Sequence, residues 1–270
     1  MPQIIRQLFE DEFKKQFDVK EAIAVNSGTS ALIAPLWSMN LKPTDEVITT
    51  PFTFPATTAA IMIAGAKPVF VDIDPNRHLI DVNLIEAAIT PNTKAILPVH
   101  LFGRMCDMDT IMEIAASNNL VVIEDTAQAL GVTYYSEYYN QPIGTIGDAG
   151  CFSFYKTKNL STFEGGMIAI KWGSKLNAMA IRAIASPTQN KPSFAELGFN
   201  FRMPEPCALI GYERLKLHKK GIQAEIPVNG EIQGFYPYLT YQLPFCANRG
   251  ITGNCPIAED VAWEIAKYHT

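Results

Sequence analysis

Residues 22–37 read AIAVNSGTSALIAPLW, which is an apolar run, a polar turn and a second apolar run. The first run, 22–25, is continuous in hydrophobicity, as is typical of a strand buried on both faces. Gly28 permits a tight turn. Apolar residues then recur at helical spacing at Ala31, Leu32, Leu36 and Trp37. The stretch therefore predicts a strand, a turn and a helix in that order.

The same alternation continues to about residue 170. Further apolar runs rich in Val, Ile and Phe occur at 46–50, 68–73, 95–100, 121–126, 151–155 and 167–170. Helical patterns lie between them, at about 56–65, after a candidate N-cap at Asp81, and at about 109–118. This order predicts a mostly parallel α/β sheet with helices on both faces. Its right-handed crossovers would bring the strand carboxyl ends to one edge, where ligands usually bind.

Beyond residue 174 the pattern changes. Helices are expected at 174–185, 204–220 and 257–268, with a loop at 186–193, and the N-terminal 1–17 has the pattern of an amphipathic helix. Pro, Gly and Asn recur through 221–256. We expect a large domain over 1–215 and a shortened C-terminal segment over 216–270, which is too short to be self-sufficient and should pack on the first.

Composition excludes several classes of function. The chain has 270 residues, 48% of them apolar, with a net charge of −5, which does not favour nucleic acid or an anionic membrane as partner. Its five cysteines include no Cys-x-x-Cys pair, which indicates reduced thiols in a cytoplasm. The four histidines have no metal-ligand spacing, so no metal is expected. The apolar stretch 55–66 is too short to span a membrane.

Two charged residues stand at predicted strand ends. Lys158 follows the strand 151–155, where partial burial would make its amine nucleophilic at neutral pH. A solvated surface lysine is the alternative, and Lys156 is equally eligible by position. Asp125 ends the strand 121–126 and could hold the proton of a pyridine nitrogen. A helix N-cap is its alternative role.

Two further features could bind a cofactor. Gly28, Thr29 and Ser30 open a helix after a strand, where backbone N–H groups suit a phosphate, although Ser and Thr are equally expected there as N-caps. Ser153 could add a hydroxyl to the same phosphate. Phe52 and Phe54 belong to the segment 51–57 and lie on one side of a strand end. Either could stack on the aromatic ring of a cofactor, or be an ordinary core residue.

A family resemblance joins these features. The motifs are SGTSAL (27–32), PFTFPAT (51–57), FVDID (70–74), PVHLFG (98–103), VVIEDTAQALG (121–131), GDAGCFSFYKTKNL (147–160), EGGM (164–167) and LGFNFRM (197–203). In this order and spacing they resemble the DegT/DnrJ/StrS family of sugar aminotransferases that depend on pyridoxal 5′-phosphate (PLP). The resemblance covers about residues 8–220. It implies the large domain of the aspartate-aminotransferase-like fold, fold-type I.

The resemblance implies a role for each site residue. Lys158 would form the Schiff base and transfer protons, Asp125 would pair with the pyridinium nitrogen, and Gln128 would lie near the phenolic oxygen. Phe54 would stack on the ring. The phosphate ligands would be Gly28, Thr29, Ser30 and Ser153. Asn200 would reach the phosphate of the neighbouring subunit, which implies a homodimer with shared active sites.

The implied activity is transfer of an amino group, from glutamate, to the keto group of a nucleotide-linked sugar. The family also contains sugar dehydratases with histidine in place of the lysine, and Lys158 favours transamination. A PLP-dependent lyase or dehydratase, a non-catalytic PLP-binding homologue and an α/β binding module without PLP are the alternatives. The non-catalytic homologue is considered because the N-terminal segment and the C-terminal domain are expected to be shorter than is usual in the family.

Overall fold

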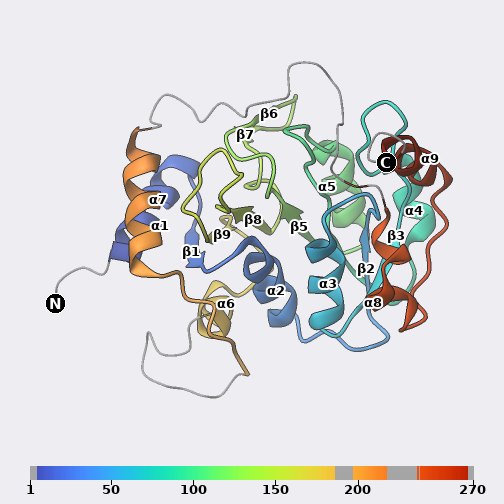
Figure 1. The fold of residues 1–270 in the computed structure, drawn as a ribbon, viewed down its shortest axis with the longest axis horizontal. Coiled ribbons are helices and arrows are strands. Elements are labelled where there is room, and N and C mark those ends of the chain that lie inside the picture. The colour runs from blue at the N-terminus through green and yellow to red at the C-terminus, as the bar shows by residue number, and fades with distance from the viewer. Residues whose placement is uncertain (1–4, 186–196, 218–235, 237, 267–270) are drawn as a thin grey trace.

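The computed structural model describes residues 5–185, 197–217, 236 and 238–266 (Figure 1). The loop expected at 186–193 lies outside these residues, as does nearly all of 218–237.

A seven-stranded mixed sheet forms the centre of the molecule, in the order β1-β9-β8-β5-β4-β2-β3. Its strands are β1 (Glu21–Val25), β2 (Glu46–Thr49), β3 (Lys67–Phe70), β4 (Thr93–Ile96), β5 (Val121–Asp125), β8 (Ala149–Ser153) and β9 (Gly166–Ile170). The five strands from β8 to β3 pair in parallel, and β9 is antiparallel to both β8 and β1. All seven predicted strands are present, and the mostly parallel sheet is confirmed.

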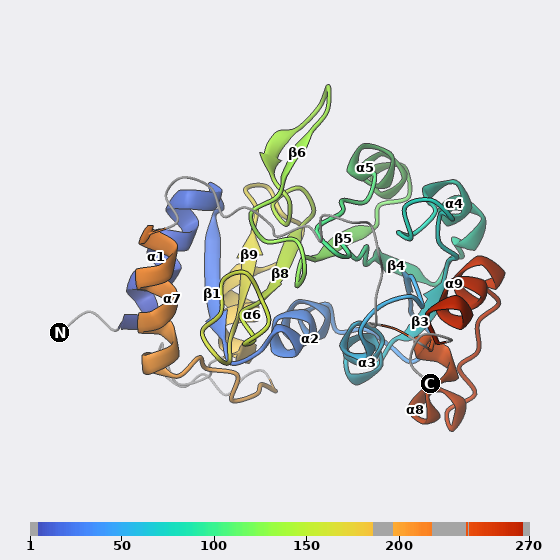
Figure 2. The ribbon, with the colours of Figure 1, turned by 45° about the horizontal axis from the view of Figure 1, so that its top comes forward.

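Helices cover both faces of the sheet. They are α1 (Ile5–Phe17), α2 (Gly28–Ser38), α3 (Pro55–Ile63), α4 (Ile85–Ala88), α5 (Met108–Ser117), α6 (Ala178–Ala185), α7 (Glu205–Leu217), α8 (Pro244–Ala247) and α9 (Pro256–Ala266). Figure 2 shows α2 and α3 on one side of the strands and α4 and α5 on the other. The Asp81 side chain accepts from the backbone N–H of Asn83, which confirms the predicted N-cap. That cap begins a short 3-10 helix, Val82–Leu84, which runs into α4.

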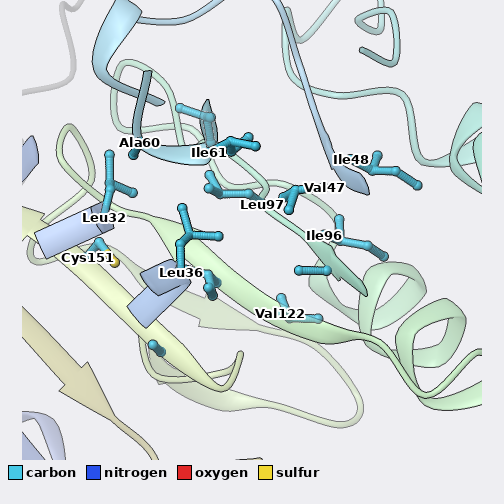
Figure 3. Packing of buried hydrophobic residues seen from close by; sticks show 14 of the residues in the cluster. Leu32, Leu36, Val47, Ile48, Ala60, Ile61, Ile96, Leu97, Val122 and Cys151 are labelled. Atoms are coloured by element: carbon cyan, nitrogen blue, oxygen red, sulfur yellow. The ribbon is translucent and has the colours of Figure 1, made fainter. Parts of the chain in front are cut away.

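The main core lies between the sheet and α2 and α3. In Figure 3, Leu32 and Leu36 of α2 lie over the central strands, among them the strands that carry Val47, Ile96 and Val122. Burying a side chain of this size contributes roughly 1.5–3 kcal/mol, so this layer is what fixes α2 against the strands.

A second apolar layer fixes α1 and α7, which pack side by side (Figure 1). Phe13 of α1 contacts Phe152 of β8, with ring centroids 5.2 Å apart. Because alternate residues of a strand face opposite ways, Phe152 enters this layer while its neighbour Cys151 enters the main core. The first and second layers thus hold β8 from both sides.

A two-stranded hairpin, β6 (Thr133–Tyr135) and β7 (Asn140–Pro142), was not predicted. It lies in the connection between β5 and β8 and projects from the body of the molecule in Figure 2. Tyr135 and Tyr138 are exposed on it. Strands of three residues with few apolar side chains leave no continuous apolar run, so the sequence pattern carries no signal for them.

The C-terminal residues pack on the β3 and α3 side of the sheet. The hydroxyls of Thr58 on α3 and Thr240 are hydrogen-bonded at 2.8 Å. The buried carboxylate of Asp72 accepts from the backbone N–H groups of Ile257 and Ala258, each at 2.9 Å, and so caps α9. None of the described helices is long and apolar enough to cross a membrane. All five cysteines are free thiols in the structure.

Candidate functional site

The residues predicted for the site gather at one edge of the sheet. Asp125 is the last residue of β5, and Ser153 is the last residue of β8. Gly28 opens α2 after β1, and Phe54 precedes α3 after β2. The segments at four strand ends therefore bring these residues to the same region, where ligands of such sheets usually bind.

Asp125 is buried and held in place by two donors. The Thr57 hydroxyl donates to Oδ2 at 2.8 Å, and the backbone N–H of Ala127 donates to Oδ1 at 3.2 Å. Burial raises the pKa of Asp125, while these two hydrogen bonds and the charge of Lys158 oppose that rise. The bond from Ala127 is of the local, capping type that was the alternative role for this residue. It leaves the carboxylate available for a further partner.

Thr57 was not predicted as a site residue. It is fully buried, and its hydroxyl lies 2.9 Å from that of Thr53. Because a carboxylate only accepts, Thr57 must donate to Asp125, and Thr53 then donates to Thr57. The segment PFTFPAT was recognised for its aromatic residues, and its threonines are the signal that could have indicated this chain of hydroxyls.

Lys158 and Lys156 differ in their surroundings. Lys156 is exposed, whereas Lys158 is partly buried. Burial lowers the pKa of Lys158, and the charge of Asp125 partly offsets this effect. Of the two lysines, Lys158 is thus the one whose amine is desolvated and lies within electrostatic reach of Asp125. This is the environment expected for a nucleophilic lysine.

The turn before α2 is closely packed against the end of β8. A side chain on Gly28 would place its Cβ 2.7 Å from the Cβ of Ser153, so only glycine fits without movement. Ser27 is the N-cap, and its Oγ accepts from the backbone N–H of Ser30. The Ser30 hydroxyl donates to the Asn26 side chain at 2.6 Å and so stabilises the turn. A helix begins without intrahelical acceptors for its first N–H groups, which suits an anion.

Gln128 is oriented by the loop after β4. Its Oε1 accepts from the backbone N–H of Phe102 at 3.1 Å, which turns its Nε2 toward the Tyr236 hydroxyl, 2.7 Å away. Burial raises the pKa of Tyr236. Tyr236 was not predicted for the site. It is 108 residues from Gln128 in the chain, and no local pattern signals so distant a contact.

The two phenylalanines of the segment 51–57 have different positions. Phe52 is fully buried and packs edge-on against Tyr236, with ring centroids 5.8 Å apart, so it is a core aromatic. Phe54 is 60% exposed at the start of α3. Of the two, only Phe54 offers a free ring face.

Asn200 is exposed, and its backbone carbonyl accepts from the Asn26 side chain at 3.3 Å. It therefore lies beside the turn before α2. Its predicted contact with a second subunit stays a prediction.

The arrangement combines a desolvated amine, a buried carboxylate and a helix N-terminus. Such a set can hold an aldehyde covalently, pair with a ring nitrogen and bind a phosphate. In the part of the chain that the structure describes, no group of three or more His, Cys, Asp or Glu side chains could hold a metal ion.

Comparison with known proteins gives a consistent result. The model of the DegT/DnrJ/EryC1/StrS aminotransferase family matches residues 5–226. GDP-perosamine synthase from Caulobacter vibrioides is 42% identical over 209 residues, which are 77% of this chain and 55% of that protein. The chain spans about half the length of the curated relatives it matches.

Solved structures agree with the fold. DesV from S. venezuelae, in complex with a ketimine intermediate, has a TM-score of 0.82 and 28% identity, covering 96% of this chain and 81% of that one. The PLP-form of the putative sugar aminotransferase Spr1654 from Streptococcus pneumoniae has a TM-score of 0.72 and 27% identity, covering 82% of this chain and 60% of that one.

Proposed function

Because the chain belongs to the DegT/DnrJ/EryC1/StrS aminotransferase family, we propose that it acts as a PLP-dependent aminotransferase on a keto sugar. The proposal rests above all on one observation: the desolvated Lys158 amine shares a strand-end site with the buried Asp125 carboxylate. When bound, PLP supplies an electron sink that makes a carbon next to nitrogen acidic. The side chains of this chain would supply the rest.

Lys158 has two tasks in this proposal. It holds the cofactor aldehyde covalently through Nζ, and, once released, it moves a proton between the carbons that lose and gain hydrogen. Both tasks need a neutral amine near pH 7. The desolvation that lowers the pKa of Lys158 favours that neutral form.

Asp125 keeps the pyridine nitrogen protonated. With Thr57 and the Ala127 N–H each occupying one of its oxygens, the carboxylate is fixed in direction and retains lone pairs for the ring N–H. The Lys158 charge and these bonds favour the ionised carboxylate against the effect of burial. This is the pairing that PLP enzymes use.

The remaining predicted residues would bind the other parts of the cofactor. Phe54 offers an exposed ring for stacking, and Gln128 is held in one orientation by the loop after β4. The phosphate would lie at the N-terminus of α2, against the point where Gly28 and Thr29 meet Ser153. The tight approach of Gly28 to Ser153 supports this position, because it brings both donor groups to one point.

The substrates follow the family. One relative is named GDP-perosamine synthase and another is named as an aminotransferase of a UDP-linked dehydro sugar, which supports a nucleotide-linked keto sugar as the proposed acceptor. Glutamate is the proposed donor. The protein would work as a cytoplasmic homodimer, with Asn200 of one subunit reaching the phosphate in the other. The exposed position of Asn200 beside the turn before α2 supports such an exchange.

Absorbance spectroscopy with PLP tests the proposal. The protein should bind PLP with a visible band, lose that band when glutamate is added, and release 2-oxoglutarate. Borohydride reduction followed by mass spectrometry should find the pyridoxyl mass on Lys158. Lys158→Ala should abolish the adduct, and the matched Lys156→Ala should not. A protein that stays colourless with excess PLP, or an adduct on Lys156, would refute the proposal.

If glutamate left the spectrum unchanged while a keto sugar lost water, the protein would be a dehydratase. If PLP formed its adduct but no donor were converted, a non-catalytic PLP-binding protein would remain. These outcomes separate the alternative functions from the proposed one.

A further inference from the structure

A buried pair of side chains lies directly behind the proposed site. Glu124 and Asp125 are consecutive residues of β5, so their side chains point to opposite faces of the sheet. Asp125 faces Thr57 and Lys158, whereas Glu124 faces His100. Glu124 and His100 are both 0% exposed. Neither belongs to the set of residues proposed to touch the cofactor.

Glu124 anchors the loop that precedes β8. Its Oε1 accepts from the backbone N–H groups of Ile146 and Gly147, at 2.8 and 2.6 Å. Its Oε2 accepts from the backbone N–H of Gly144 at 2.8 Å and lies 3.1 Å from His100 Nε2. Four donors surround the carboxylate, two at each oxygen, which is its full capacity.

This loop determines where β8 lies. Gly144 has a φ of +87°, and a Cβ on Gly150 of β8 would collide with the Gly144 carbonyl. The loop thus lies directly on the strand that ends at Ser153 and leads to Lys158. A shift of the Glu124 carboxylate would therefore move the loop, and with it the strand that delivers the amine.

His100 anchors the second loop, which follows β4. The backbone N–H of Cys106 donates to His100 Nδ1 at 3.1 Å, so that nitrogen carries no proton. The proton is on Nε2, which donates to Glu124. Between these anchors, Phe102 holds the Gln128 side chain through its N–H. His100 thereby fixes the loop that orients Gln128.

We infer that Glu124 and His100 form a positioning pair that ties together the loops carrying the two sides of the proposed site. One hydrogen bond joins the loop behind β8, and thus Lys158, to the loop that orients Gln128. The pair also contacts the main chain of Asp125, because the backbone N–H of His100 donates to the Asp125 carbonyl at 3.0 Å. The expected effect of the pair on PLP rests on the proposed function, whereas the geometry of the pair is independent of it.

The pattern of donors and acceptors predicts which substitutions the pair tolerates. In Glu124→Gln an amide NH₂ would replace one oxygen and face the donors that the oxygen now accepts from. His100 could accept from that NH₂ only by moving its proton to Nδ1, where the proton would oppose the Cys106 N–H. His100→Leu would remove both ring contacts. His100→Gln can still accept from Cys106 and donate to Glu124, so it is the conservative variant.

The first measurement needs no cofactor. Amide hydrogen exchange in the cofactor-free proteins should be at least about tenfold faster at Gly144, Ile146 and Gly147 in Glu124→Gln than in wild type, because a buried hydrogen bond to a charged group is lost. His100→Leu should act the same way, and His100→Gln should restore most of the protection.

The second measurement is PLP affinity, followed by its absorbance. Glu124→Gln and His100→Leu should weaken PLP binding about 10- to 100-fold, the effect known for groups that orient the ligands of a metal ion. His100→Gln should lie near wild type.

The matched control is Asp72→Asn. Asp72 is also a buried carboxylate with three backbone N–H donors, Ile73, Ile257 and Ala258, but none of these belongs to either loop. The variant should lower stability and leave PLP affinity and the exchange of the three loop amides unchanged.

The outcomes separate this inference from the proposed function. Wild-type protein that takes no PLP refutes the function, while the exchange data still decide the pair. The positioning pair would be overturned if a folded His100→Leu protein showed unchanged exchange of the three loop amides and unchanged PLP affinity. It would also be overturned if Asp72→Asn changed that exchange and that affinity as much as His100→Leu does. If His100→Leu does not fold, ¹⁵N NMR of the wild-type ring decides: a proton on Nε2 is expected, and an Nε2 without a proton contradicts the pair.

Discussion

Replacing Arg182 by methionine should expose how strongly α1, β1 and α6 depend on one buried charge. The Glu10 side chain on α1 is almost fully buried and accepts from the Ala24 N–H at 2.9 Å and from Arg182 Nη1 at 2.8 Å. The other arm of Arg182 donates to Glu21 and to the Ala22 carbonyl of β1. Methionine keeps the apolar volume of the stem and removes every donor.

The size of the effect follows from the charge left behind. Breaking a buried ion pair by removing one partner costs about 3–5 kcal/mol, because the remaining charge is uncompensated. For a chain of this size that loss lowers Tm by roughly 6–20 °C. Adding Glu10→Gln removes the orphaned charge and should recover most of the loss. Arg214→Met is the surface control: Arg214 donates to the Ser161 carbonyl from an exposed position, and its loss should change stability by less than about 0.5 kcal/mol.

The pH dependence gives an independent check with a definite sign. Burial raises the pKa of Glu10 above its ordinary value of 4.5, and Arg182 opposes that rise. Without Arg182 the folded-state pKa rises further above the unfolded one, so the folded variant binds a proton more tightly than the unfolded chain. Stability must then fall as pH rises through this range. The deficit relative to wild type should be largest near pH 8 and shrink as the pH falls toward 4.5.

Urea denaturation at a series of pH values measures both quantities. A deficit below about 1 kcal/mol at pH 8, or one that does not change with pH, would show that the Glu10 carboxylate is solvated in the folded protein. A double variant no more stable than Arg182→Met would show that the loss comes from packing of the arginine stem instead.

Three further results are expected. Thr57→Val should lower the stability of the cofactor-free protein by about 1.5–3 kcal/mol in urea, because the buried Asp125 loses a hydrogen bond. Thr57→Ser keeps the hydroxyl and should cost only about 0.8 kcal/mol, for the buried methyl group that it removes. Phe163 is largely exposed and has a φ of +68°, a backbone conformation that glycine adopts more easily than residues with a Cβ. Phe163→Gly should therefore raise stability by about 1 kcal/mol, and Phe163→Ala, which keeps a Cβ, should give no gain. Labelling of Lys158 by trinitrobenzenesulfonate in the cofactor-free protein should reach half its limiting rate at a pH below 10.5, the ordinary pKa of a lysine amine, because burial lowers the pKa of Lys158; a midpoint at or above that pH would contradict this.

The sheet and the strand-end residues could be predicted because their signals are local. A buried parallel strand is a short apolar run in the sequence. The polar residue at its end can be recognised directly, as for Asp125 and Ser153. The turn at Gly28 is likewise contained in a few consecutive letters. The helices followed from their spacing and caps, including the one begun by Asp81.

The missing parts of the site depend on contacts between distant segments. Thr57 and Asp125 are 68 residues apart in the chain, and Gln128 and Tyr236 are 108 apart. A buried threonine that aligns a carboxylate has the same local sequence as one that only packs. Which of the two it is depends on how α3 meets β5, and that is decided by packing between α3 and the sheet rather than by the letters around Thr57.

The register of β5 unites the proposed site with the pair behind it. Side chains alternate along a strand, so a slip by one residue would turn Asp125 toward the loop before β8 and Glu124 toward Thr57. The shorter aspartate could not reach the loop amides that Glu124 binds, and the longer glutamate would crowd the hydroxyl that Asp125 accepts from. The slipped register would therefore be destabilised on both faces of the sheet. On one face the three backbone N–H groups that donate to Glu124 would lose their acceptor, and on the other the Thr57 hydroxyl would lose its contact with Asp125. The same carboxylates that serve the chemistry and the positioning thus also specify the pairing of the central strand.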